Sequence, residues 1–140
     1  MDSNRTGRQR GQAIAEFAIV IPLLFLMIVG LFDVGRIVYI NNAVAEGARE
    51  GARWGAVQGR AGTSAGLISV ADEVKARMTA VPNPAVTVTC DRLITTTIEC
   101  STGDIINVQV TSSVTPMTPI IGEFIGPVSV SATAKMSIHQ

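Results

Sequence analysis

A long apolar run near the N-terminus constrains this chain more than any other feature. Between Gly11 and Phe32 the only charged side chain is that of Glu16. A helix of about 20 residues crosses a hydrocarbon core about 30 Å thick. Residues 13–32 have this length, and a membrane helix tolerates a proline such as Pro22. The sequence therefore predicts one membrane-spanning helix.

The charges that flank the run predict its orientation. Arg5, Arg8 and Arg10 precede it, and only Asp2 opposes them. Segments rich in Lys and Arg stay in the cytoplasm, so we expect the N-terminus inside and the residues after the span outside. A secretory signal peptide is the alternative, but its apolar core would be shorter and would end at a cleavage site between small residues.

Glu16 needs a physical explanation. A carboxylate in a spanning helix costs about 2.5–3.5 kcal/mol at the membrane centre, and less near an edge. One interpretation is an acid that reaches up to the headgroup region. The other is an acid that pairs with a positive group within the membrane. The α-amino group of a neighbouring chain, cut just before Gln12, would serve.

The segment also resembles a known protein family. Cleavage between Gly11 and Gln12 makes Glu16 the fifth residue of the mature chain. Basic residues, a glycine and an apolar helix with glutamate at that place resemble the class III signal of type IV pilins, which prepilin peptidase removes. The strings R-G-Q-A-I-A-E-F-A-I-V-I-P-L-L, D-V-G-R-I-V-Y and A-V-A-E-G-A-R-E-G-A-R are similar to TadE-like pseudopilins of tight-adherence (Tad/Flp) pili.

This resemblance implies a location and a set of partners. It implies a single-pass protein of the bacterial cytoplasmic membrane, or of an extracellular pilus. The implied partners are membrane lipid, other pilin or pseudopilin subunits, prepilin peptidase and, indirectly, an assembly platform and motor ATPase. Major Tad pilins usually have Glu-Tyr in place of Glu16-Phe17 and are shorter, so a minor component is favoured. The alternatives are an unprocessed bitopic structural or adhesion protein and a pseudopilin of a secretion system.

Three regions follow from these observations: a cytoplasmic leader over residues 1–11, a spanning and stem helix over 12–58, and an extracytoplasmic head over 59–140. In the stem, Gly47, Gly51 and Gly55 recur every four residues and lie on one helix face. A face without side-chain bulk allows close packing. Its partner is either the protein's own sheet or another subunit.

The head is expected to be a small α+β unit. A turn at residues 58–63 precedes a helix at 64–80, where apolar residues recur with helical spacing. The period then changes to two in four segments, namely 86–90, 96–100, 106–110 and 128–138. This pattern predicts an antiparallel sheet of about four strands, with the second helix packed on its apolar face.

Two details of the head remain open in the sequence. Cys90 and Cys100 form a disulfide only if residues 91–99 make a loop that is closed at its base. Residues 101–104 would then be a hairpin turn that joins 98–100 to the next strand. Two buried free thiols are the alternative. The apolar connection at 116–127 either folds over the end of the sheet or presents its side chains to a partner or to lipid.

Other function classes lack support. Net charge is zero and aromatic residues make up 4%, so neither a basic surface nor a stacking platform for nucleic acid is present. His139 is the single histidine, and no His, Cys and carboxylate cluster has metal-ligand spacing. Neither a nucleophile motif nor a phosphate-binding loop occurs. We therefore expect no enzyme activity, no metal and no cofactor.

Overall fold

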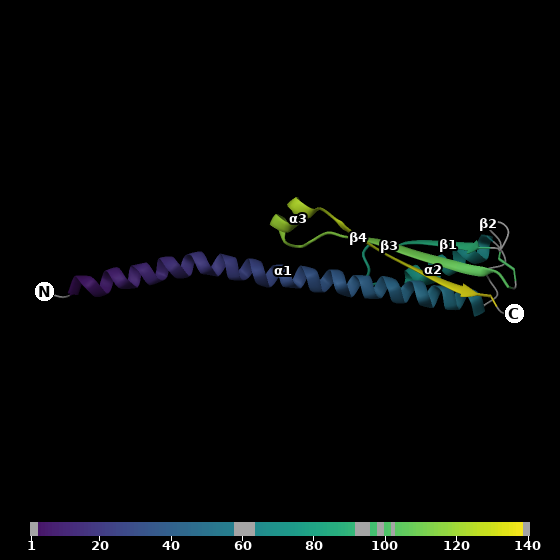
Figure 1. Cartoon of the computed structure of the whole chain (residues 1–140), viewed down its shortest axis with the longest axis horizontal. Coiled ribbons are helices and arrows are strands. Elements are labelled where there is room, and N and C mark those ends of the chain that lie inside the picture. The colour runs from purple at the N-terminus through teal and green to yellow at the C-terminus, as the bar shows by residue number, and fades with distance from the viewer. Residues whose placement is uncertain (1–2, 58–63, 92–95, 98–99, 102, 139–140) are drawn as a thin grey trace.

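One long helix organises the whole chain (Figure 1). The computed structural model describes residues 3–57, 64–91, 96–97, 100–101 and 103–138. Its elements in chain order are α1 (Ser3–Val57), α2 (Ser64–Arg77), β1 (Ala85–Asp91), β2 (Thr96–Thr97), β3 (Ile105–Val114), α3 (Pro119–Ile125) and β4 (Val128–Ser137). The expected turn at 58–63 lies outside the described residues.

Helix α1 has 55 residues and includes Pro22 in its interior. At about 1.5 Å per residue its length is about 80 Å. It begins at Ser3, within the expected leader, and so extends the helix predicted for residues 12–58 by more than two turns. The head packs only on the C-terminal half, and the N-terminal half projects alone (Figure 1).

Helix α2 begins at the predicted residue but ends at Arg77, three residues before the predicted end. The Met78 amide still bonds back to Val74 and Lys75, and the Val81 amide then bonds to the Met78 carbonyl in a turn. The residue before a proline disfavours helical geometry, so the chain leaves the helix ahead of Pro82.

The sheet is antiparallel with the order β2-β1-β3-β4. Three of its strands are long, and β2 consists of only two residues. The α+β class is therefore confirmed, with a minimal fourth strand. The hairpin predicted between 98–100 and 105–110 is wrong. Strand β3 pairs with β1, with Cys90 opposite Ile106, and with β4, with Val114 opposite Val128.

The core lies between the helices and one face of this sheet. Helix α1 contacts β3 and β4, and α2 contacts α1 and β1. The most buried side chains are Ile40, Val44, Val70, Cys90, Ile106, Val108, Val110 and Val114. In the strands, the residues next to these buried ones face the opposite side of the sheet and are mostly Ser, Thr, Asn and Gln. One sheet face is thus apolar and covered, and the other is polar, as the period of two predicts.

The structure contains a disulfide between Cys90 and Cys100, whose Cα atoms are 5.5 Å apart. Cys100 lies outside the strands, because the chain leaves the β1–β2 pair after Thr97. The predicted turn at 101–104 is present, since the Asp104 amide donates to the Ser101 carbonyl at 3.0 Å. The Ser101 amide in return donates to the Asp104 carboxylate at 2.7 Å. This turn leads from the disulfide into β3.

Candidate membrane anchor and its junction with the head

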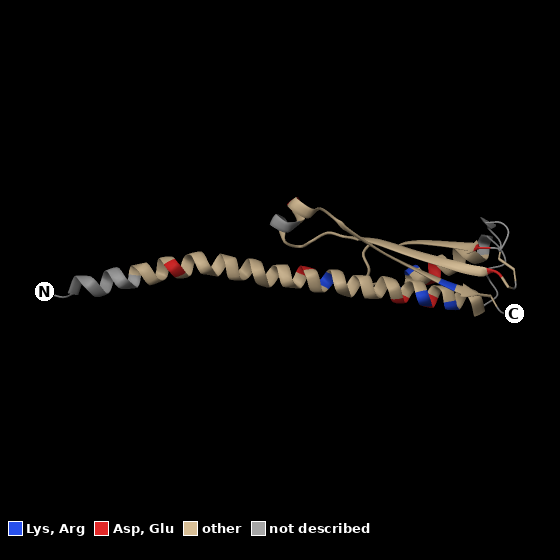
Figure 2. Ribbon diagram, in the orientation of Figure 1, with Lys and Arg blue, Asp and Glu red and all other residues tan. Residues whose placement is uncertain are grey.

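The projecting half of α1 is apolar and uncovered. It is long and apolar enough to cross a membrane. None of its residues from Gly11 to Phe32 is buried, and Leu31 and Phe32 are 75% and 74% exposed. Between Gly11 and Phe32, Figure 2 shows a single charged residue, whereas most other charges of the described residues lie beside the head. An exposed apolar surface of this extent marks a contact with lipid or with other proteins.

Glu16 is that single charged residue. Its side chain is exposed, and the side-chain Nε2 atom of Gln12 donates to its Oε1 atom at 3.1 Å. Gln12 therefore lies one helical turn before Glu16, on the same face. Gly11 is also exposed, and a Cβ atom placed on it would have no neighbour within 4 Å. This arrangement leaves the Gly11–Gln12 bond and the Glu16 carboxylate on the surface of the helix.

The glycine stripe of α1 contacts the head of the same chain. A Cβ atom on Gly47 would lie 2.6 Å from Met78 Sδ, and one on Gly51 would lie 2.5 Å from Val74 Cγ2. A Cβ atom on Gly55 would collide with Ile106. Ala48, Ala52 and Ala56 alongside them are buried. Of the two partners left open by the sequence, the structure places the protein's own α2 and β3 against the stripe.

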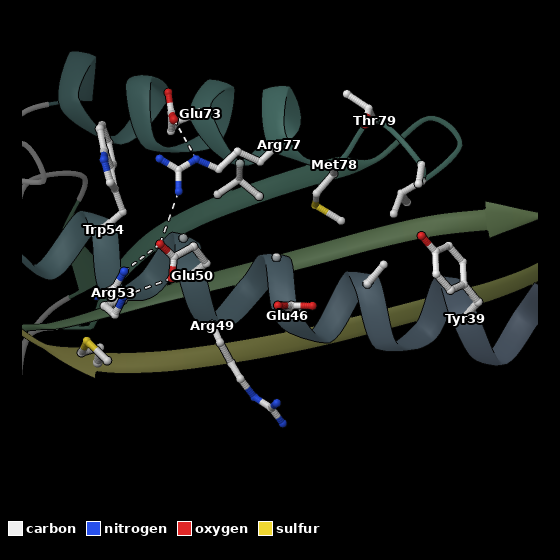
Figure 3. A pocket seen from close by; sticks show the side chains of 17 residues that line it. Tyr39, Glu46, Arg49, Glu50, Arg53, Trp54, Glu73, Arg77, Met78 and Thr79 are labelled. Carbon is white, nitrogen blue, oxygen red and sulfur yellow. Dashed lines mark hydrogen bonds and ion pairs between the residues drawn. The ribbon is translucent and has the colours of Figure 1, made fainter.

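A network of charged side chains joins α1 to α2 beside this contact (Figure 3). Glu50 accepts hydrogen bonds from Arg53 Nε and Nη2, both at 3.0 Å, and from Arg77 Nη1 at 3.3 Å. Arg77 Nε also donates to Glu73 at 2.8 Å. The hydrogen bond from Arg53 is the main cause that lowers the pKa of Glu50. Glu50 and Arg53 lie three residues apart on one helix, whereas the link from Glu50 to Arg77 depends on the fold.

A groove runs along this network between the two helices. Besides the ion pairs it is lined by Tyr39, Glu46, Trp54, Met78 and Thr79 (Figure 3). Glu50, Glu73, Arg53 and Arg77 are bonded to one another, so their charges are already compensated within the protein. The groove is therefore the boundary between the stem, α1, and the head, and we call it the stem–head seam. In the described residues, no group of three or more His, Cys, Asp or Glu side chains is placed to hold a metal ion.

Asp33 forms the junction between the membrane helix and the head. Its side chain is buried, and its Oδ1 atom accepts a hydrogen bond from the Met117 amide at 2.8 Å. Its Oδ2 atom accepts from the amide and the hydroxyl of Thr118. One turn further on, Arg36 Nη1 donates to the Thr115 carbonyl at 3.5 Å. Helix α1 thus holds the start of the β3–β4 connection at the point where its apolar run ends.

We expect this junction to weaken in acid. The hydrogen bond from the Thr118 side chain, followed by those from the two amides, lowers the pKa of Asp33 below its ordinary value of 3.8. A carboxylate with a lowered pKa stabilises the folded state above its ordinary pKa, and this stabilisation is lost as pH falls through the folded value. The Met117 and Thr118 amides should therefore exchange slowly at pH 7 and lose protection below about pH 4.

The matched measurement is amide hydrogen exchange of the full chain in detergent, corrected for intrinsic rates. Asp33→Asn replaces one acceptor oxygen with an NH2 group, so it should lower protection at pH 7 at the amide that faces this group, and it should abolish the acid-dependent change at both amides. Asp72→Asn changes an exposed acid elsewhere on the head and should leave both amides unaffected. Equal protection in Asp33→Asn and the unmodified protein would rule out the anchoring role.

Together the fold and these contacts define a protein with one candidate membrane span, a rigid stem and a small α+β head. The family model described as TadE-like protein matches residues 11–53. This segment, which contains Glu16, Asp33 and Gly51, is similar to that family, and the resemblance seen in the sequence is confirmed. No curated protein and no solved structure was found to match the chain. The match and the apolar helix indicate a membrane-anchored, pilus-related structural protein.

Proposed function

We propose that this protein is a pilin-like subunit that assembles with a Tad/Flp-type pilus after prepilin peptidase cuts it between Gly11 and Gln12. The observation that carries the proposal is Glu16, the single charged residue in the apolar and uncovered segment from Gly11 to Phe32. A membrane protein retains an intramembrane charge when the charge has a partner or a task. The TadE-like match over residues 11–53 supports the same conclusion.

The assembly step follows from charge compensation. The basic residues Arg5, Arg8 and Arg10 hold the N-terminus in the cytoplasm while the apolar helix enters the membrane. Cleavage removes these residues and creates a positively charged α-amino group on Gln12. In a bundle of like helices, Glu16 of one subunit neutralises this amino group on its neighbour. Each charge then has a partner in a medium where an isolated charge is costly.

The different surroundings of the two halves of α1 support different roles for them. Its glycine stripe is occupied by α2 and β3, so the C-terminal half holds the head as one rigid unit. Its N-terminal half has no covering element among the described residues. Lateral contacts between subunits are therefore expected through residues 13–32, in the membrane and later in the fibre. Extraction itself requires a separate motor ATPase and platform.

Glu16→Ala tests this mechanism in cells that produce the pilus. The variant should enter the membrane at least as well as the unmodified protein, because it removes a charge from the span. Its incorporation into sheared pili should fall by about tenfold or more, because the neighbour's amino group loses its partner in a low-dielectric site.

The control is Glu46→Ala, which removes an exposed acid further along the same helix, beyond the apolar run. It should leave both membrane insertion and incorporation unchanged. Membrane and pilus fractions are compared by immunoblotting. Normal incorporation of Glu16→Ala would exclude the pairing mechanism. Absence of the unmodified protein from the pilus fraction would favour the unprocessed bitopic alternative.

A further inference from the structure

The connection between β3 and β4 presents apolar side chains that the protein itself leaves uncovered. Met117 is 75% exposed, Phe124 is 88% exposed and Ile125 is 66% exposed. Phe124 is the most exposed of the large apolar side chains in the described part of the chain. Of the two alternatives that the sequence left open for 116–127, the structure thus shows an outward-facing segment.

The position of this segment relates it to the membrane. Its first residues are bonded to Asp33, the first charged residue after the apolar run of α1. Helix α3 projects from the end of the sheet that faces the N-terminal half of α1 (Figure 1). When residues 13–32 span the bilayer, Asp33 marks its outer boundary. Helix α3 then lies at the level of that boundary (Figure 1).

The chemistry of the segment fits a lipid surface. Residues 115–127 contain no Lys or Arg, and their single charge is that of Glu123. The backbone of α3 bonds internally, with the Gly122 amide donating to Thr118 and the Gly126 amide donating to Gly122. Internally bonded backbone and apolar side chains are what the interfacial region of a bilayer accepts. A basic patch for lipid phosphates is absent from this segment.

We propose that α3 inserts Phe124 and Ile125 into the outer leaflet, giving the head a second contact with the membrane besides the spanning helix. This inference rests on the proposed membrane span and extends it. Apolar burial drives the contact, so it requires no anionic lipid. Because Asp33 and Arg36 fix the base of α3 to α1, the contact sets the tilt of the head against the bilayer. Extraction of the subunit from the membrane must break it.

The test uses the full chain in phosphatidylcholine vesicles with and without brominated acyl chains, which quench tryptophan on contact. The natural Trp54 lies in the stem–head seam and gives the baseline. Three variants each add one tryptophan: Phe124→Trp in α3, Leu24→Trp in the span, and Thr133→Trp on the exposed polar sheet face. Each position is exposed, so folding should tolerate the change.

We expect brominated lipid to quench the added tryptophan of Phe124→Trp nearly as strongly as that of Leu24→Trp, with no quenching of Thr133→Trp. Quenching of Leu24→Trp alone would overturn the α3 contact and leave the span intact. Quenching of neither would overturn both. If Phe124→Trp shifts to shorter wavelength without quenching, and only at high protein-to-lipid ratio, α3 binds a second copy of the chain and the lipid contact is wrong.

Discussion

Replacing Gly51 with leucine should separate the head from the stem. A Cβ atom at this position would lie 2.5 Å from Val74 Cγ2 and 3.3 Å from Val108 Cγ1. Valine side chains have little freedom at χ1, so neither can rotate away without cost. Leucine gains about 1 kcal/mol of helix propensity over glycine, but overpacking a core costs about 1–3 kcal/mol and sometimes more. Because Val74 and Val108 must both shift, we expect a cost at the upper end of this range and a net loss of about 2 kcal/mol after the propensity gain.

Gly35→Leu is the matched control on the same helix. A Cβ atom on Gly35 would meet nothing within 4 Å, and the residue is exposed. This variant should be unchanged or more stable by up to about 1 kcal/mol. Denaturant unfolding of the full chains in detergent, followed through the tertiary signal of the head, measures the difference. Equal unfolding midpoints for the two variants would show that the stripe does not hold the head.

Loss of the disulfide should have an effect at least as large. Cys90 is fully buried in β1, and Cys100 closes the loop that follows it. Closing a loop of this length in the unfolded chain is worth about 2–4 kcal/mol in the entropy model. The double variant Cys90→Ala with Cys100→Ala should lose stability by about this amount. Alanine avoids leaving two polarisable thiols in the core.

Reduction provides an independent control for the cysteine pair. Dithiothreitol should lower the unfolding midpoint of the unmodified protein toward that of the double variant, and it should not affect the double variant. The stem–head contact through Gly51 does not involve either cysteine. If the native protein is alkylated by iodoacetamide under denaturing conditions without prior reduction, the two thiols are free and this prediction is wrong.

Periodic features of the sequence were sufficient to predict much of the fold. The uncharged run indicated the span, the four-residue spacing of Gly47, Gly51 and Gly55 indicated a packing face, and alternation indicated the long strands. These signals are local, because each follows from the repeat of a helix or a strand. The same locality explains the start of α2 at Ser64, where helical spacing of apolar residues begins.

Contacts between distant residues could not be predicted in this way. Asp33 marked only the end of the span in the sequence, yet it binds Met117, 84 residues further along the chain. The partner of β3 was misassigned because alternation fixes which face of a strand is buried but does not select its neighbour. The sequence showed that α3 is apolar. Whether its side chains are exposed depends on the direction in which the β3–β4 connection projects from the sheet.

The mature N-terminus is the measurement that tests the central claim most directly. Intact-mass and N-terminal peptide mass spectrometry of the protein, isolated from membranes and from sheared pili, identifies the first residue. The charge-pairing account requires a chain that begins at Gln12 in the pilus fraction, with Glu16 fifth. Pilus-incorporated protein that still carries residues 1–11 would have no new amino group beside Glu16 and would contradict the account.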